Sequence, residues 1–417
     1  MSGPLALGIN GLGRIGKLTL WHHVARKHFD EIVVNVGRQI GPNLEAVCGL
    51  IENDSTYGAM HRFLFGVNAA PCVKIVDRDK GLLDVADVPV RVLQTARNPQ
   101  AIAWRDHGVR LVVDCTGAFV DPTCPPDDGK GALRGHLDAG AEVVINSSAF
   151  KIKDKSLAMP TDAATLIYGI NHELFNPSQH KVVSAASCTT TALAHMVKPL
   201  LDRLDASTIM TASMSTVHAA TNSQSVLDTI PAAGATDLRK SRSALNSIIL
   251  TSTNAARALE QVIPRIREIG FMADSVRIPI PTESLIILNL TFQAHLTAEG
   301  SSTITAESLN AIYGEEATGR QAGRLVFSEA QNVPTDVAGM KAAVVIEGHE
   351  THTRTGFLGL DLRKIPGLDA SVVEKLDDPI ARIPVTHAKI FGWYDNEYGS
   401  YTNMLGDLTV HIADRLD

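Results

Sequence analysis

Short apolar runs alternate with segments of helical periodicity along the first half of the chain. Residues 5–10 (LALGIN) have the pattern of a buried strand, and a helix is expected over 17–27. The strand-like segments VRLVVDCTGAF and AEVVINS follow, with a helix expected between them around 132–139. Strands that alternate with helices are typical of a parallel sheet. The pattern therefore predicts an α/β fold with an N-terminal, Rossmann-type doubly wound sheet.

Other segments of the chain show different patterns. Residues 54 to about 99 indicate short strands and turns, and residues 165–175 (TLIYGINHELF) are expected to form a further strand. Beyond a helix that starts near residue 188, STIMTASMSTVHAA alternates like a strand, and DSVRIPIPTESLIILNLTF predicts two strands joined by a Pro-rich turn. The chain closes with an aromatic strand, a polar turn and an amphipathic helix. A second domain is therefore expected after residue 188.

Composition and charge narrow the class of protein. The 417 residues suffice for two or three domains, with 45% hydrophobic and 20% charged residues. A net charge of −7 gives no basic field, so a nucleic-acid partner is not expected. The sequence has no recognisable targeting segment, no apolar stretch of bilayer length and no C-x-x-C pair among its five cysteines. These features predict a cytoplasmic protein with no membrane partner, no disulfide framework and no metal site.

One cysteine stands where a predicted strand runs into a predicted helix. In KVVSAASCTTTALAHMVK, residues 181–198, Cys188 falls at the helix N-terminus, where free N–H groups and the helix dipole stabilise a thiolate. We therefore expect a lowered pKa and a nucleophilic thiol; a buried, inert cysteine is the alternative. The hydroxyl groups of Ser187 and of residues 189–191 favour the reactive interpretation, because anions also bind at such helix ends.

His218 is the candidate base for this thiol. It lies 30 residues after Cys188, near the end of a predicted strand. A helix of about four turns and a returning strand fit this separation, so the imidazole can come back over the thiol. A purely structural histidine is the alternative. A cysteine paired with a histidine base is, however, a recurring catalytic arrangement.

A glycine-rich turn near the N-terminus indicates a dinucleotide. Gly11, Gly13 and Gly16 form G-x-G-x-x-G between a predicted strand and a predicted helix. In this context the glycines allow a tight turn and the close approach of a pyrophosphate, which the helix N-terminus stabilises.

The end of the next strand bears on the choice of cofactor. It carries Gly37 and Arg38 where an acidic residue usually holds the ribose hydroxyls. An arginine can pair with a 2′-phosphate, so the sequence leans towards NADP or dual use, with a solvent-facing Arg38 as the alternative. Arg97, Thr116 and Gly117 are further candidates for the cofactor site, because the last two follow directly on the strand that ends in LVVDC.

Cations and hydroxyl groups gather in the second half of the chain. Arg239, Lys240 and Arg242 lie in a long predicted loop, and a Thr/Ser cluster at 251–253 precedes a helix. This combination indicates phosphate binding, with a solvated loop or a subunit contact as the alternative. Arg277 opens an apolar strand pair and suggests a second phosphate-binding pole.

A series of motifs runs in order along nearly the whole chain: NGLGRIG, DCTGAF, YGINHE, ASCTT, STVHAATN, LTSTNAAR, VRIPIPTES and WYDNEYG. With them the chain resembles the phosphorylating glyceraldehyde-3-phosphate dehydrogenase family. The resemblance implies an NAD(P)-binding domain over 1–187, completed by a C-terminal helix within 393–417. It also implies an α+β catalytic domain over 188–392 and a homotetramer.

The same resemblance implies roles for single residues. Cys188 becomes the nucleophile and His218 the base that activates it, while Thr221 and Arg277 hold the substrate phosphate. The further implied residues are Ser187, Thr189, Thr253, Asn254, Lys240 and Arg242 at or beside the incoming phosphate, and Arg14, Ile15 and Asn396 at the pyrophosphate and the nicotinamide.

The chain departs from the family pattern at Thr191, Ala192, His195, Lys240 and Asn254 and in two longer segments. Asn254 stands where the family commonly has glycine, and Lys240 replaces an arginine, which keeps the charge but cannot form a bidentate fork. The extra length is most visible near 121–131 and 346–382. The chain is therefore expected to be a divergent, elongated member.

The resemblance implies an activity and leaves alternatives. The expected enzyme oxidises glyceraldehyde 3-phosphate with NAD or NADP and inorganic phosphate to 1,3-bisphosphoglycerate, through a thioester on Cys188, in glycolysis or gluconeogenesis. One alternative is a paralogue that acts on erythrose 4-phosphate. Another is a non-catalytic, NAD(P)-binding redox sensor.

Overall fold

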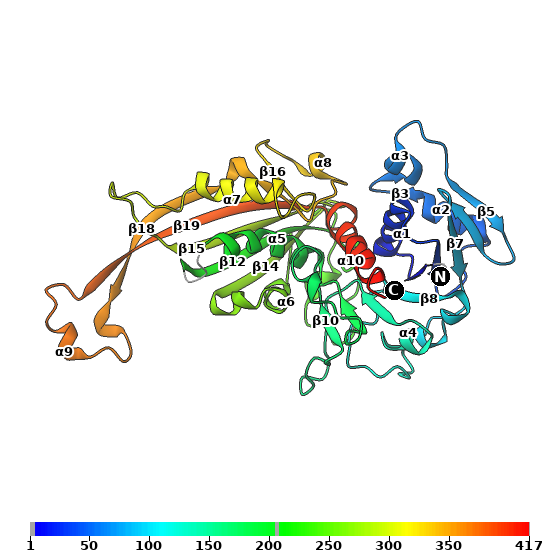
Figure 1. Ribbon diagram of the computed structural model, residues 1–417, viewed down its shortest axis with the longest axis horizontal. Coiled ribbons are helices and arrows are strands. Elements are labelled where there is room, and N and C mark those ends of the chain that lie inside the picture. Colours follow the sequence, from blue (N-terminus) through cyan, green and yellow to red (C-terminus); the bar gives the residue numbers. More distant parts are fainter. Residues whose placement is uncertain (1–4, 205–207, 417) are drawn as a thin grey trace.

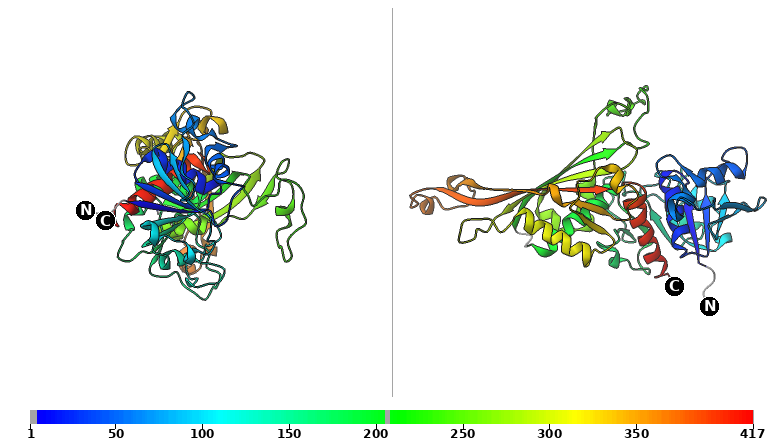
Figure 2. Two further views of the ribbon diagram at one scale, coloured as in Figure 1. Left: turned by 90° about the vertical axis from the view of Figure 1, so that its right-hand side faces the viewer. Right: turned by 90° about the horizontal axis from the view of Figure 1, so that it is seen from above.

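The computed structural model describes residues 5–204 and 208–416. Two large sheets follow one another along the long axis of the molecule (Figure 1). A long two-stranded arm projects from the C-terminal sheet, away from the N-terminal one (Figures 1 and 2). Within the described ranges no helix is long and apolar enough to cross a membrane.

The N-terminal sheet has nine strands in the order β10-β11-β9-β8-β1-β2-β7-β6-β5. The strands from β10 to β7 pair in parallel, and β6 and β5 add an antiparallel edge. The central strands are almost wholly buried, as expected where helices cover both faces. The predicted α/β, Rossmann-type sheet is thus confirmed. The strands are β1 (Ala6–Asn10), β2 (Glu31–Asn35), β5 (Val73–Asp77), β6 (Leu82–Val85), β7 (Val88–Leu93), β8 (Val109–Asp114), β9 (Val143–Asn146), β10 (Ala163–Thr165) and β11 (Val182–Ser184).

Short helices and a small ladder connect these strands. The helix after the glycine turn begins earlier than expected, and the helix expected over 132–139 is shorter. Residues 60–65 form a helix where strands and turns are expected, because Phe63 packs against the rings of Trp21 and Tyr398. Local pattern does not report such distant packing. The elements are α1 (Arg14–Arg26), α2 (Leu44–Glu52), β3 (Asn53–Asp54), β4 (Gly58–Ala59), α3 (Met60–Phe65) and α4 (Gly135–Asp138).

The prediction of a strand over 165–175 is wrong. The chain leaves the sheet after Thr165 and turns, because the Asn171 side chain reaches back and binds the backbone at the start of the turn. Its Oδ1 accepts from the Ile167 N–H at 2.8 Å, and its Nδ2 donates to the Thr165 carbonyl at 2.9 Å. An asparagine that satisfies backbone groups in this way competes with a sheet ladder.

The C-terminal sheet is mixed, in the order β13-β14-β12-β15-β19-β17-β16, with β18 paired to β19. Apolar side chains of three helices pack with its strands in one continuous core. This is the predicted α+β unit. Its elements are α5 (Cys188–Arg203), β12 (Ile209–Ala219), β13 (Ile249–Thr251), α6 (Ala255–Val262), β14 (Gly270–Ile278), β15 (Ser284–Gln293), α7 (Ala306–Thr318), β16 (Leu325–Ser328), α8 (Pro334–Val337), β17 (Val344–Glu347), β18 (His352–Asp361), α9 (Ala370–Val373) and β19 (Ile380–Tyr394).

The C-terminal helix α10 (Asn403–Ala413) lies between the two sheets and packs on α1 (Figure 1). Arg26 of α1 donates to the Asn403 side chain at 2.8 Å and pairs with Asp407 at 2.7 Å. The His22 and Tyr398 rings stack with centroids 4.0 Å apart. The chain end therefore returns to the first domain as predicted, while the boundary between residues 187 and 188 stays a prediction.

Candidate active site

Cys188 is the first residue of α5, directly after the turn that leaves β11. Ala186 has a positive φ of 58°, which bends the chain sharply between strand and helix. Ser187 caps the helix, because its Oγ accepts from the Thr190 N–H at 3.2 Å. The thiol therefore stands at a helix N-terminus, as the sequence predicts.

His218 reaches this thiol from the end of β12. Its Nε2 lies 3.5 Å from Cys188 Sγ, and its Nδ1 lies 2.8 Å from the Ala219 carbonyl oxygen. Arg277, the register partner of His218 on the neighbouring strand β14, contacts the same Nδ1 through Nη1. The structure thus brings together the two residues of the predicted catalytic pair.

The electrostatics of the pair differ from the sequence-based expectation. Burial raises the pKa of the Cys188 thiol, and Arg277 and Thr189 offset this only in part. The expectation of a lowered thiol pKa is therefore wrong. Burial removes the water that would solvate the thiolate, and this effect outweighs the stabilisation by the Arg277 charge and by the hydrogen bonds at the helix end. Burial and the Arg277 charge lower the pKa of His218 to about 3. At neutral pH the ligand-free site accordingly holds a thiol beside an uncharged imidazole.

A cavity of about 950 Å³ opens over the thiol. The glycine turn and the turn that follows β19 border the cavity on one side, and strand ends of the second sheet border it on the other. Nine predicted site residues line it: Arg14, Ile15, Gly117, Ser187, Cys188, His218, Thr221, Arg277 and Asn396.

Asn396 follows β19 and is held by its acceptor. Ser284 Oγ and Thr282 Oγ1 donate to Asn396 Oδ1 at 3.1 Å and 3.5 Å. Its Nδ2 has no protein partner among residues 5–204 and 208–416 and belongs to a side chain that lines the cavity. This orientation leaves an amide N–H₂ for a ligand acceptor, such as a carboxamide oxygen.

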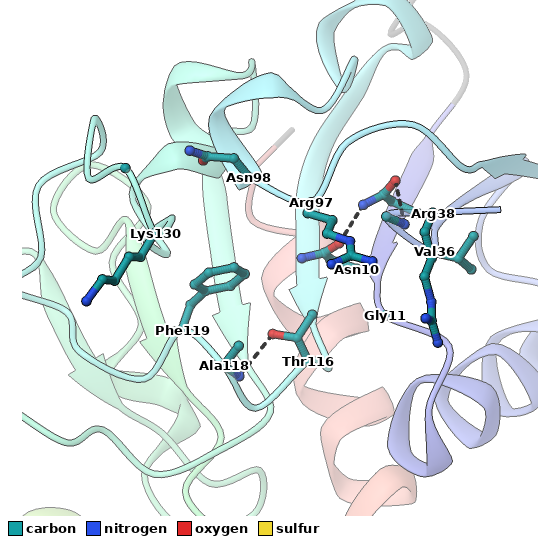
Figure 3. A pocket seen from close by; sticks show the side chains of 13 residues that line it. Asn10, Gly11, Val36, Arg38, Arg97, Asn98, Thr116, Ala118, Phe119 and Lys130 are labelled. Atoms are coloured by element: carbon teal, nitrogen blue, oxygen red, sulfur yellow. Dashed lines mark hydrogen bonds between the residues drawn. The ribbon is translucent and has the colours of Figure 1, made fainter. Parts of the chain in front are cut away.

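A second cavity, of about 570 Å³, lies at the carboxyl ends of the first-domain strands (Figure 3). The predicted residues Gly11, Arg38, Arg97 and Thr116 line it, together with Lys130, which sequence reasoning missed. Lys130 belongs to the long 121–131 loop, and no motif in that loop indicates that its side chain lines this cavity. Within the described ranges none of Arg38, Arg97 and Lys130 has an ion-pair partner, and the residues that line the cavity include no carboxylate.

The glycine turn leaves room for a phosphate group. Gly11 has a φ of 94°, and a Cβ on Gly16 would lie 1.9 Å from the Gly11 carbonyl oxygen, so both positions require glycine. A Cβ on Gly13 would meet nothing within 4 Å. Gly13 and Arg38 line a third cavity, of about 530 Å³. Open space over a helix N-terminus between two cavities fits the pyrophosphate of a dinucleotide.

Alanine at Gly16 and at Gly13 should separate folding from binding. We expect G16A to destabilise the protein by about 1–3 kcal/mol because of the backbone clash, and to lower Tm by several degrees. G13A should leave Tm within about a degree but weaken dinucleotide affinity, since its methyl group occupies the open space. Thermal unfolding and cofactor titration check both; equal effects of the two variants on Tm would contradict the account.

Several predicted phosphate residues lie outside the thiol cavity. The Thr189 hydroxyl is buried and 2.9 Å from Tyr394 Oη. Arg242 pairs with Asp228 at 3.1 Å on the exposed loop that joins β12 and β13 (Figure 2). Lys240, Thr253 and Asn254 do not line the cavity either. Their roles stay predictions.

Arg14 links the glycine turn to the Asn396 turn. Its Nε donates to Glu397 Oε1 at 3.0 Å, and it also pairs with Asp54. Although burial opposes it, the Lys17 ammonium, two backbone N–H groups and then the Arg14 charge lower the pKa of Asp54 to about 2. The Arg14 side chain is thus engaged by two carboxylates, which fixes the glycine turn against the turn that follows β19.

Glu283, beside this turn, is buried without a partner. It is 1% exposed, has a φ of 70°, and neither carboxyl oxygen has a hydrogen-bond partner. Burial, and then the charges of Asp395 and Glu397, raise its pKa to about 9. The folded protein therefore holds a proton here that the unfolded chain releases near pH 4.

Glu283→Gln should flatten the dependence of stability on pH. A raised carboxyl pKa contributes stability that is lost as pH rises between about 4 and 9, with a slope of up to about 1.4 kcal/mol per pH unit. We expect the wild-type Tm to fall more between pH 5 and 8 than the Tm of E283Q. The exposed Glu329→Gln variant serves as control. Parallel curves for E283Q and wild type would contradict the assignment.

One group in the described part of the chain could hold a metal: His172, Glu173 and His411, with ligand atoms within 4.8 Å of one another. The Arg415 guanidinium already contacts two of these three side chains. Its Nη1 lies 3.1 Å from His411 Nδ1 and its Nη2 lies 3.2 Å from Glu173. A guanidinium in this position opposes a second cation.

Comparison with known proteins agrees with the fold and the cavities. Residues 5–122 match the family model described as glyceraldehyde 3-phosphate dehydrogenase, NAD binding domain, and residues 187–362 match the C-terminal domain of the same enzyme. The chain is 31% identical over 410 residues to glyceraldehyde-3-phosphate dehydrogenase 1 of Streptomyces avermitilis, covering 98% of this chain and 99% of the relative. It is also 31% identical over 410 residues to the enzyme of Geobacillus stearothermophilus, covering 98% of each chain.

The Rossmann-type sheet, the cavity at its strand ends and the match to an NAD-binding domain define an NAD(P)-binding protein. The family matches narrow this class: the chain belongs to the glyceraldehyde-3-phosphate dehydrogenase family, and the resemblance seen in its motifs is confirmed. The tip of the arm beyond residue 362 lies outside both family models.

Proposed function

We propose that the protein is a phosphorylating glyceraldehyde-3-phosphate dehydrogenase that works through a thioester on Cys188. The observation that carries this proposal is the 3.5 Å contact between Cys188 Sγ and His218 Nε2 inside a cavity that also contains Arg277 and Asn396. A thiol, a base, a guanidinium for a phosphate and an amide for a carboxamide are the groups that this reaction needs.

The dinucleotide would extend between the two cavities. The residues that fit it are Gly11, Gly13 and Ile15 at the pyrophosphate and Asn396 at the carboxamide, with the Asn396 N–H₂ donating. When bound, the nicotinamide supplies the hydride acceptor. The protein's part is to orient this ring over the thiol and to exclude water.

The chain's own residues move the protons. Sγ of Cys188 bonds to the aldehyde carbon while Nε2 of His218 takes the thiol proton. The Cys188 backbone N–H, at the start of α5, and His218 stabilise the oxygen of this adduct. His218 returns this proton to the adduct oxygen, which becomes a hydroxyl group, and takes it up again as hydride leaves the adduct carbon for the bound nicotinamide and the thioester forms. Inorganic phosphate then attacks the thioester carbon, the acyl phosphate leaves, and His218 returns its proton to the Cys188 sulfur, which restores the thiol.

We also propose a preference for NADP or use of both cofactors. Arg38 and Arg97 lie on one side of the cavity, Lys130 lines the opposite side, and no acidic residue directly follows β2 (Figure 3). Two guanidinium groups on one side of the cavity suit a 2′-phosphate.

Arg38→Ala should cost about 1.5–3 kcal/mol in NADP affinity and leave NAD affinity unchanged. Lys130→Gln should have a smaller effect, because Lys130 lines the opposite side of the cavity from Arg38. Lys80→Gln, on the β5–β6 hairpin, is the control. Titration of both cofactors measures the effect, and equal losses for NAD and NADP would refute the pairing.

The reaction itself is tested by cofactor reduction with two sugars. We expect steady turnover with glyceraldehyde 3-phosphate that stops when inorganic phosphate is omitted. Faster turnover with erythrose 4-phosphate would favour the paralogue. The departures from the family pattern at Lys240 and Asn254 are the reason to test this alternative. Thiol reactivity without any cofactor reduction would favour a redox sensor instead.

We further propose a cytoplasmic homotetramer with domains at 1–187 plus 393–417 and at 188–392. Exposed apolar side chains on the β12–β13 loop support association between subunits. Ile230 is 94% exposed, and Val226 and Leu227 of the same loop are also exposed. Light scattering on the purified protein tests the tetramer.

A further inference from the structure

Glu283 stands between the two residues that hold the Asn396 side chain. Its chain neighbours Thr282 and Ser284 both donate hydrogen bonds to Asn396 Oδ1, at 3.5 Å and 3.1 Å. Thr282 Oγ1 also donates to Asp395 Oδ1 at 3.0 Å. Asn396 lines the thiol cavity, so the orientation of its amide depends on where the backbone around Glu283 places these two hydroxyl groups.

The backbone at Glu283 adopts a conformation that residues with a side chain rarely take. Its φ of 70° lies in the left-handed region. Such a conformation persists only where the surroundings hold it. The Glu283 side chain is 1% exposed, so its packing helps to hold the backbone. If this side chain left its buried position, the backbone would relax and both neighbouring hydroxyl groups would shift.

The Glu283 carboxyl group has no partner that would stabilise a negative charge. Within the described residues neither of its oxygens has a hydrogen-bond partner. Burial, and then the charges of Asp395 and Glu397, raise its pKa to about 9. The nearby cation, Arg14, is engaged by Glu397 at 3.0 Å. An ionised Glu283 would therefore be a buried charge beside two carboxylates, which is unfavourable.

The other ionisable groups beside this turn keep their charge over the range in which Glu283 titrates. Although burial opposes it, Glu397 and then Asp54 raise the pKa of Arg14, which stays a cation. The pKa of Asp54 is lowered to about 2, so this carboxylate stays ionised. Burial raises the pKa of the Tyr57 phenol, which keeps its proton. We therefore assign a change of charge near pH 9 in this region to Glu283.

We infer that Glu283 is a positioning residue that holds Asn396, and through it the nicotinamide end of the cofactor, while its carboxyl group is neutral. The neutral side chain stays buried and keeps the backbone in place. When the proton passes to solvent, the carboxylate moves towards water, the backbone relaxes, and Thr282 and Ser284 release Asn396. The inference rests on the proposed function, in which Asn396 meets the nicotinamide carboxamide.

Binding of two ligands at different pH tests this inference. Reduced NAD carries the nicotinamide, whereas ADP-ribose has the adenosine and the pyrophosphate but no group that reaches Asn396. We expect the Kd of reduced NAD for the wild type to rise by roughly fivefold or more between pH 7 and pH 10, because the complex retains a proton that the free protein releases near pH 9. The Kd of ADP-ribose should change by less than about twofold.

Three variants separate the Glu283 proton from other effects of alkali. Glu283→Gln cannot ionise, so its Kd for reduced NAD should stay level where that of the wild type rises. Asn396→Ala removes the group that Glu283 positions, so the two ligands should then show the same dependence on pH. The exposed Glu329→Gln variant should follow the wild type.

Two results with the wild type alone would overturn the inference, even if Glu283→Gln does not fold. One is an equal rise in the Kd of both ligands, which would mean that alkali acts on the whole dinucleotide site. The other is a level Kd for reduced NAD. Equal curves for Glu283→Gln and the wild type would also overturn it.

The inference and the proposed function can fail separately. Phosphate-dependent turnover of glyceraldehyde 3-phosphate together with a level Kd for reduced NAD would remove the positioning role and leave the dehydrogenase assignment. A Kd for reduced NAD that rises with pH in the wild type but not in Glu283→Gln, in a protein that reduces no cofactor, would keep the positioning role and remove the assignment.

Discussion

Cys188→Ser is expected to reduce turnover of glyceraldehyde 3-phosphate by on the order of 10⁴-fold or more. The serine hydroxyl fits the first turn of α5, but at neutral pH it is a far weaker nucleophile than a thiol and forms an ester rather than a thioester. The measurement is cofactor reduction at saturating inorganic phosphate. Because Cys188 lines the cavity and the serine side chain differs from it by one atom, the fold should persist.

Three controls separate lost chemistry from lost structure in this variant. Tm and dinucleotide affinity should match those of wild type, because the glycine turn and Asn396 are untouched. Cys115→Ser, at the cofactor-side strand end, should keep most of the activity. Residual turnover above about a hundredth of wild type in Cys188→Ser would contradict a covalent role for this residue.

His218→Asn is expected to lower kcat/KM by about 10²–10⁴-fold. Asparagine keeps a polar side chain near Arg277 but cannot accept a proton at neutral pH. The wild-type imidazole, with its pKa lowered to about 3, is uncharged and available as a base throughout the physiological range. The loss should therefore appear mainly in the chemical step, with little change in dinucleotide affinity.

The pH profile of the same variant gives a second readout. Without a base, reaction requires a thiolate formed by simple ionisation, and burial raises the pKa of that thiol. We therefore expect the activity of His218→Asn to climb with pH above about 8.5, the ordinary thiol pKa, and to approach wild type only in alkaline solution. A constant ratio of variant to wild type across the pH range would argue against a proton-accepting role.

Much of the site follows from local sequence because its parts are local. The glycine turn sits between a strand and a helix, and G-x-G-x-x-G specifies that turn within six residues. Cys188 stands where small residues bend the chain into an apolar helix, so its place at the helix N-terminus can be read directly. The distance to His218 follows from one helix and one strand.

What the sequence does not reveal depends on contacts across the fold. Lys130 reaches the cofactor cavity from a Pro/Gly/Asp loop whose composition says only that it turns. The Thr189 hydroxyl turns inward because Tyr394, far along the chain, offers it a partner. The raised thiol pKa depends on burial by several segments at once. Residues 346–382, whose chemistry stays undeciphered, supply the arm with strand β18, helix α9 and the first residues of β19.

The central claim is a thioester on Cys188 that inorganic phosphate releases, and a pre-steady-state burst tests it most directly. Enzyme, dinucleotide and glyceraldehyde 3-phosphate are mixed without phosphate, and reduced cofactor and the mass of the Cys188 peptide are followed. We predict one equivalent of reduced cofactor per active site, an acyl adduct on that peptide, and continuous turnover once phosphate is added. Steady turnover without phosphate, or a burst with no adduct on Cys188, would contradict the account.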